Sequence, residues 1–138
     1  MAIKVVIGTK SGKSYQKELS ADESEALYGR VLGEELNGET LGFSGVKFLI
    51  SGGSDSEGFP MRKDLPGTRR KRVLITKGLG FKGKLRGKRH NGLRLKKSIA
   101  GNTVYEKTHQ LNLKVISGDK VIEKAFAPAE PEAAPAQE

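Results

Sequence analysis

The chain has no cysteine, and no apolar run in it approaches the ~18 residues that a membrane-spanning helix requires. Without cysteine there is neither a disulfide framework nor a thiolate metal site. The first residues, MAIKVVIGTKSGKS, turn polar too soon to form the apolar core of a signal peptide. These absences predict a protein of the reducing cytoplasm that makes no contact with a membrane.

Acidic residues are almost absent from residues 62–97. This segment holds 15 of the 25 Lys and Arg residues and a single acid, Asp64, so its net charge is +14, against −5 for the rest of the chain. It is rich in glycine and poor in aromatic residues, and it has little apolar area to bury by itself. Positive charges at this density repel one another unless a polyanion neutralises them, and phosphates do so directly. Because no basic helix is available to enter a major groove, structured RNA is favoured over DNA as the partner.

Alternating apolar and polar residues predict six or seven short strands, and a capping box of Ser20 and Glu23 predicts one short helix over 21–28 or to 32. We therefore expect a mainly β fold, an antiparallel sandwich or barrel. A small closed or partly open antiparallel β-barrel is favoured, because it removes sheet edges. The barrel domain would span 1–126, with 62–97 as its basic insert, and a disordered acidic Ala/Pro tail would follow over 127–138. The expected strands are 2–9, 13–19, 46–51, 72–76, 93–99, 111–116 and 121–126.

Residues 51–61, SGGSDSEGFPM, are predicted to form a rigid turn that directs the basic insert away from the barrel. One of its two adjacent glycines is expected at a positive φ, because they end a strand and begin a reversal. Its aspartate is a typical turn residue that accepts hydrogen bonds from backbone amides. Phe59 and Met61 would pin the turn to the core. The residues assigned to this structural turn are Gly52, Gly53, Asp55, Gly58 and Pro60.

A nucleotide-binding enzyme is one alternative, because Gly78–Gly83 matches G-x-G-x-x-G directly after the 72–76 strand. A dinucleotide fingerprint needs a helix next and an acid about 20 residues further on. The following KLRGKRHNGL has no helical period, and 99–102 contain no acid. The two histidines, His90 and His109, are too few for a metal site. We therefore expect no catalytic residues, no metal, no cofactor and no small-molecule substrate.

The run LISGGSDSEGFPM, followed by a basic loop and then LRLKKSIAGN, resembles the S6e family of small-subunit ribosomal proteins of archaea and eukaryotes. The similarity covers about residues 1–124. It implies a β-barrel protein with a structural role, bound to small-subunit rRNA and beside neighbouring ribosomal proteins. Eukaryotic members continue into a long basic extension with phosphorylated serines, whereas this chain has an acidic Ala/Pro tail and is similar to the archaeal type. The kinase regulation of eukaryotic members is therefore not expected here.

The expected function is that of a structural constituent of the small ribosomal subunit, monomeric when free, and a free RNA-binding protein or chaperone is the other alternative. Residues 79–92 are expected to be mobile or extended away from the barrel without RNA and to become ordered on binding. His90 would contact a phosphate or a base. The expected RNA-binding residues are Arg62, Lys63, Arg69, Arg70, Lys82, Lys84, Arg86, Lys88, Arg89, His90, Arg94, Lys96 and Lys97.

Overall fold

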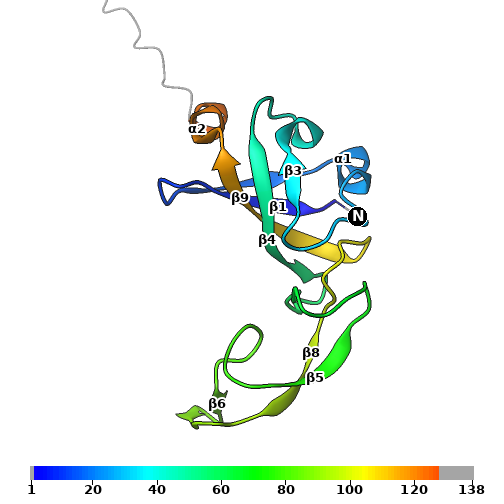
Figure 1. The fold of residues 1–138 in the computed structure, drawn as a ribbon, viewed down its shortest axis with the longest axis vertical. Helices are drawn as coiled ribbons and strands as arrows, with labels where there is room; N and C mark the ends of the chain where they lie inside the picture. The colour runs from blue at the N-terminus through cyan, green and yellow to red at the C-terminus, as the bar shows by residue number, and fades with distance from the viewer. Residues whose placement is uncertain (1, 128–138) are drawn as a thin grey trace, which may run out of the picture.

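The structure, a computed structural model, describes residues 2–127. A five-stranded sheet with three short helical elements forms a body, residues 2–61 and 100–127, and an arm of residues 62–99 extends from one end of it (Figure 1). The tail predicted over 127–138 lies, apart from Ala127, outside the described residues.

The body sheet has the strand order β2-β1-β9-β4-β3. β1 pairs with β9 in parallel, and the other neighbours pair antiparallel. The arm contributes two separate two-stranded ribbons, β5-β8 and β6-β7. The strands are β1 (Lys4–Gly8), β2 (Ser14–Glu18), β3 (Glu35–Asn37), β4 (Lys47–Asp55), β5 (Lys71–Ile75), β6 (Lys84–Leu85), β7 (Lys88–Arg89), β8 (Leu95–Ile99) and β9 (Thr108–Ser117); the helices are α1 (Ala21–Glu25), the 3₁₀ helix η1 (Gly38–Leu41) and α2 (Asp119–Phe126).

The mainly β class is confirmed, but the closed barrel is not. Within residues 2–127 the strand order ends at β2 and β3, and these two strands do not pair with each other. β9 pairs with β1 on one side and with β4 on the other, so β2 and β3 form the two edges of an open sheet. Its edge strands are short instead: β3 has three residues, and β2 has five, of which the exposed ones, Ser14, Gln16 and Glu18, are polar or charged.

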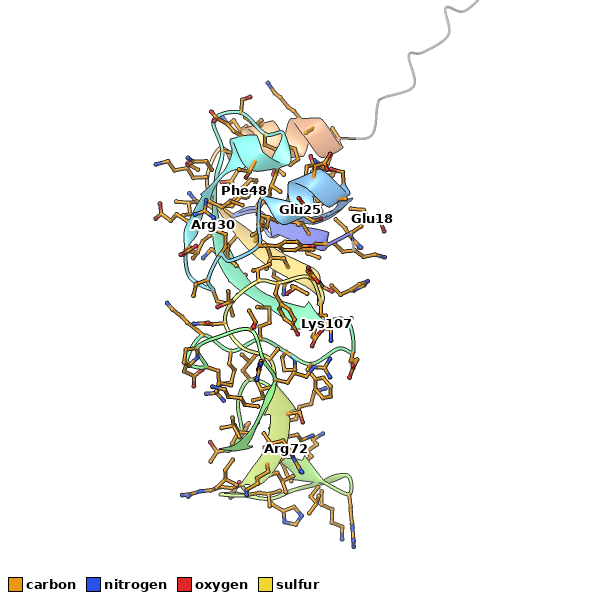
Figure 2. All side chains as sticks on the ribbon, turned by 90° about the vertical axis from the view of Figure 1, so that its right-hand side faces the viewer. Glu18, Glu25, Arg30, Phe48, Arg72 and Lys107 are labelled. Carbon is orange, nitrogen blue, oxygen red and sulfur yellow. The ribbon has the colours of Figure 1, made fainter. Side chains whose placement is uncertain are left out.

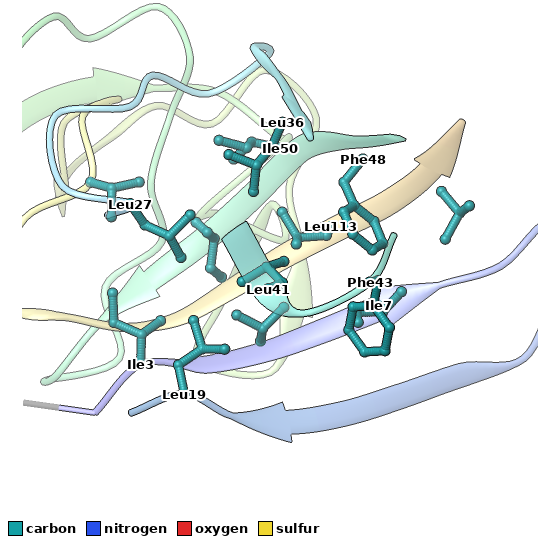
Figure 3. Close-up of a cluster of buried hydrophobic side chains, with 14 of the residues drawn as sticks. Ile3, Ile7, Leu19, Leu27, Leu36, Leu41, Phe43, Phe48, Ile50 and Leu113 are labelled. Atoms are coloured by element: carbon teal, nitrogen blue, oxygen red, sulfur yellow. The ribbon is translucent and has the colours of Figure 1, made fainter. Parts of the chain in front are cut away.

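The core lies between one face of this sheet and the helices (Figure 3). The alternating pattern of β1 and β9 buries every second side chain, including Val5, Ile7 and Leu113. Leu41 of η1 and Phe43 beyond it pack into the same cluster. The buried side chains of the body thus form one continuous cluster.

The predicted helix at Ser20 begins as expected. The Ser20 hydroxyl accepts a hydrogen bond from the Glu23 amide at 3.3 Å, and the Glu23 carboxylate accepts one from the Ser20 amide at 3.1 Å, which completes the capping box. The helix is shorter than predicted: α1 ends at Glu25, and turns follow.

The strand predicted over 121–126 is wrong, because these residues belong to helix α2. Ile122 is buried, and Phe126 stacks on Tyr15 with 5.0 Å between the ring centroids. The four-residue spacing of Ile122 and Phe126 places both on one helical face, so packing against the body decides in favour of the helix.

The turn predicted over 51–61 begins later than expected, because β4 continues through Gly52 and Gly53. Neither glycine has a positive φ, so that expectation is wrong; Gly58 in the following turn has φ +84°. Gly53 lies in a crowded position instead: a Cβ there would stand 2.7 Å from the Gln110 carbonyl oxygen and 2.9 Å from the Met61 sulfur. The requirement for glycine at 53 therefore comes from packing between β4, β9 and the turn.

We predict opposite outcomes for alanine at the two adjacent glycines. Gly53→Ala should lower the free energy of unfolding by about 1–3 kcal/mol, because the new methyl group overpacks a tight contact. Gly52→Ala is the matched control and should stay within about 0.5 kcal/mol of the parent protein, because the nearest atom to its Cβ is 4.0 Å away. Urea unfolding of the three proteins measures the difference, and equal losses for the two variants would contradict the packing argument.

Candidate RNA interface

The arm is built on the antiparallel pairing of β5 with β8, in which Val73 lies opposite Lys97 and Leu74 opposite Lys96. Residues directly opposite in such a pair project from the same face. One face carries Val73, Ile75, Leu95 and Ile99, and the other carries exposed side chains, including Arg72, Leu74 and Lys96. The ribbon therefore has an apolar face and a basic face, as the alternation of residues 93–99 predicted.

The arm has a small core of its own, which its composition did not indicate. Ile75, Phe81 and Ile99 are buried together there. Phe81 lies within the segment 79–92 that was expected to bury little, and the Lys97 ammonium lies 5.7 Å from the centre of its ring. Leu65, Val73, Leu93 and Leu95 pack around this cluster.

A two-residue hairpin, β6–β7, forms the far end of the arm (Figure 1). Its turn residues, Arg86 and Gly87, have φ values of +50° and +79°, the geometry of a tight primed hairpin turn. Among the described residues Arg86 is the one non-glycine residue with a positive φ. Local backbone strain of this kind is typical of functional positions, and here it presents an arginine at the end of a basic arm.

The G-x-G-x-x-G motif does not form a nucleotide-binding turn. Gly78 and Phe81 exchange backbone hydrogen bonds of 2.9 and 3.1 Å in a tight reversal, and β6 follows directly after Gly83. A dinucleotide site needs a helix at this point, whose N-terminus faces the phosphates. The geometry therefore contradicts the nucleotide-binding alternative.

Eleven of the 13 predicted RNA-binding residues are exposed on the arm, and two are half-buried. The half-buried residues, Arg62 and Arg70, both have carboxylate partners within the chain. Sequence reasoning did not select Lys71, Arg72 and Lys77, which are equally exposed; the density of charge around them was the available signal. The exposed predicted residues are Lys63, Arg69, Lys82, Lys84, Arg86, Lys88, Arg89, His90, Arg94, Lys96 and Lys97.

Arg70 joins the arm to the body through two carboxylates. Its Nε donates a hydrogen bond to Asp55 Oδ2 at 2.6 Å, and its Nη1 donates to Glu57. The guanidinium also lies 4.9 Å from the centre of the Phe59 ring. Phe59 thus supports Arg70 rather than the body core, whereas Met61 is buried in that core as predicted.

The Asp55 side chain is fully buried at this junction. The Ser56 amide donates a hydrogen bond to Asp55 Oδ1 at 2.6 Å, the backbone-amide contact predicted for this turn, and the Tyr105 hydroxyl donates to Oδ2 at 3.2 Å. Burial disfavours ionisation of the carboxyl, but the bonds from Arg70 and Ser56 outweigh it and hold the pKa of Asp55 below its usual value. Burial, together with the nearby Asp55 charge, raises the pKa of the Tyr105 hydroxyl.

The two ends of the arm cross closely where they join the body. The Ala100 amide donates a hydrogen bond to the Pro60 carbonyl at 3.0 Å, and the Asn102 amide donates to the Leu65 carbonyl at 2.8 Å. Gly101 is required here, because a Cβ at this position would stand 1.8 Å from the Gly67 carbonyl oxygen. This crossing and the Arg70 ion pairs fix the direction in which the arm leaves the body.

Comparison with known proteins gives the family. The family model for ribosomal protein S6e matches residues 3–127. The chain belongs to the ribosomal protein S6e family. The chain is 44% identical over 125 residues to small ribosomal subunit protein eS6 of Methanothermobacter thermautotrophicus, covering 90% of this chain and 94% of that protein. It is 40% identical to the eS6 of Methanosphaera stadtmanae, covering 96% and 98% of the two chains, and 39% identical to that of Nitrosopumilus maritimus, covering 95% and 90%.

The family is one of structural ribosomal proteins, so the S6e chain is not an enzyme. In the described part of the chain, residues 2–127, no three His, Asp or Glu side chains gather as metal ligands. None of the helices described there has the length and apolar character that a membrane crossing requires.

We predict that Asp55→Asn flattens the acid dependence of stability. The folded-state pKa of Asp55 lies below the ~3.9 of an unfolded aspartate. Its ionisation therefore stabilises the fold above that value, and this contribution is lost as the pH falls through the folded-state pKa. The variant should be less stable than the parent at pH 7 and lose less unfolding free energy between about pH 5 and pH 2.

Unfolding by urea at a series of pH values measures this effect. Asp64→Asn is the matched control, because the Asp64 side chain is 65% exposed in its pair with Arg62, and exposed ion pairs contribute little. Identical pH dependence of the parent and Asp55→Asn proteins would contradict the role of Asp55.

Proposed function

We propose that this S6e protein is a structural constituent of the small ribosomal subunit and that its arm binds rRNA. The function follows the family, whose archaeal relatives carry the name small ribosomal subunit protein. The observation that supports the arm as the binding element is the concentration of exposed Lys and Arg on a narrow projection, in a segment of net charge +14. The protein acts in the cytoplasm, where archaeal ribosomes lie.

Charge on both sides of the ribbon favours insertion of the arm between RNA segments. Arg72 and Lys96 extend from the basic face of the β5–β8 ribbon, whereas Lys71 and Lys97 extend from the opposite face at the margins of the arm core. Arg86 occupies the far end. An arm that met RNA on one face alone would leave half of these charges without phosphates.

The body has a different part in this proposal. Outside residues 62–97 the chain carries a net charge of −5, so the body as a whole does not attract the phosphates of RNA. Its surfaces face neighbouring ribosomal proteins in the subunit, and the protein is a monomer when free. Arg70 pairs with Asp55 and Glu57 of the body and sets the direction of the arm, Arg62 pairs with Asp64 within the arm, and the exposed cations contact phosphates.

Sedimentation tests the function against the alternative of a free RNA-binding protein or chaperone. The tagged chain, expressed in an archaeal cell, should migrate with small subunits at physiological salt. A variant in which two glycines replace residues 84–89 keeps Phe81 and the arm core, and it should leave the subunit fractions. A full-length chain that stays at the top of the gradient would overturn the ribosomal assignment.

We predict that the tip of the arm determines the salt dependence of RNA binding. Each phosphate neutralised contributes a slope of about −0.7 to −0.9 to the plot of log affinity against log salt. Replacing Lys84, Lys88 and Arg89 with alanine should therefore make the slope shallower by about 2–3, roughly one for each lost contact.

The matched control removes the same charge from the body. Lys10→Ala, Lys120→Ala and Lys124→Ala together remove three exposed cations from the body, one in the β1–β2 turn at its side and two in α2 at the end away from the arm (Figure 1). Titrations of a small-subunit rRNA transcript at several salt concentrations compare the two triple variants. Equal loss of slope in both would show that net charge alone, and not the arm, governs binding.

A further inference from the structure

Two adjoining cavities open where the arm meets the body. The first, of about 350 Å³, has Tyr28, Val104, Tyr105 and Glu106 among its lining residues. The second, of about 310 Å³, is lined by the cations Arg69, Arg70 and Lys107 and by the Glu57 carboxylate. Tyr105 and Thr68 line both cavities, so the two share a wall. Their volumes lie at the lower end of the range of small-ligand sites, about 300–1,000 Å³.

The tyrosine-lined cavity has a rigid aromatic wall. The hydrogen bond from the Tyr105 hydroxyl to the buried Asp55 fixes one end of that ring. Tyr28 is partly buried and packs against the body core. Aromatic rings held in this way are the usual platforms on which unstacked RNA bases lie.

The neighbouring cavity carries the charge that a phosphate requires. Arg70 is already balanced by Asp55 and Glu57. Arg69 and Lys107 are exposed, and no carboxylate within residues 2–127 forms an ion pair with either. Lys107 lies at the end of the body that faces the arm (Figure 2). Because Arg70 balances Asp55 and Glu57 at least in part, Arg69 and Lys107 leave the second cavity net cationic, beside the apolar aromatic first cavity.

We propose that these cavities bind one unstacked nucleotide of RNA, with its base against Tyr28 and Tyr105 and its phosphate between Arg69 and Lys107. Glu106 sets the orientation, because its carboxylate repels a phosphate from the tyrosine-lined half and accepts a hydrogen bond from an exocyclic amino group of a base. The proposal rests on RNA binding by this protein. It adds a base-contacting site on the body, since Tyr28, Tyr105 and Lys107 lie outside the basic segment.

Nuclear magnetic resonance of the full chain tests the site directly. The protein has three tyrosines, and Tyr15 is an internal control because it stacks on Phe126 of α2. With hexa-adenylate as the probe, the ring signals of Tyr28 and Tyr105 should shift while those of Tyr15 stay in place. Backbone amide signals of the arm, recorded in the same titration, report binding by the arm independently.

Variants then separate stacking from charge. Tyr105→Leu should weaken hexa-adenylate binding on the order of ten-fold without changing the salt slope, because a stacked base is lost. Tyr105→Phe keeps the ring and should bind within about two- to three-fold of the parent. Lys107→Ala should make the salt slope shallower by about one.

If the ring signals of Tyr28 and Tyr105 do not shift, the proposed nucleotide site is overturned, whether or not the amide signals of the arm shift. Shifts confined to arm amides would leave the proposed function standing without this site. Absence of shifts in both the arm and the tyrosines would remove the site and the RNA-binding role of the arm together.

Discussion

β4 and β9 lie side by side in the middle of the body sheet, and both ends of the arm leave from this pair. Their register brings Asp55, the last residue of β4, opposite Thr108, the first of β9. This pairing holds the two chain ends of the arm close enough for Gly101 to lie against the Gly67 carbonyl and for Arg70 to reach Asp55. The position of every exposed cation on the arm depends on that short crossing. A basic segment without it would have the same charge and no fixed direction.

Much of the fold follows from local patterns. The β1–β2 hairpin, the capping box at Ser20 and the β5 and β8 strands appear close to where alternation and capping rules predict them. These patterns do not show which strands pair, and so neither the parallel β1–β9 pairing nor the open ends of the sheet at β2 and β3 could be predicted from them. The α2 helix was missed because Val121 and Ile122 favour strands, while the packing of Phe126 on Tyr15 is a tertiary effect.

The candidate interface divides in the same way. The density of charge along the sequence is enough to locate the interface and to select most of its exposed cations, because lysine and arginine side chains are usually exposed. Charge density cannot separate an arginine that binds phosphate from one held by a carboxylate. Arg62 has its acid two residues away, a signal that was available, but Arg70 finds Asp55 and Glu57 only through the fold. The two tyrosines of the cavity beside the arm are likewise far apart in the sequence, because Tyr28 follows α1 and Tyr105 precedes β9.

β9 is the last strand within residues 2–127 and yet occupies the centre of the sheet, where residues 4–8 pair with residues 110–114. Contacts between such distant segments form slowly, because a long loop has to close first. During synthesis β1 therefore has only β2 beside it until β9 emerges, and its open edge is exposed to incorrect pairing. The β5–β8 ribbon, in contrast, closes between Lys71 and Ile99. On the ribosome that makes it, the arm is complete before the sheet that will carry it.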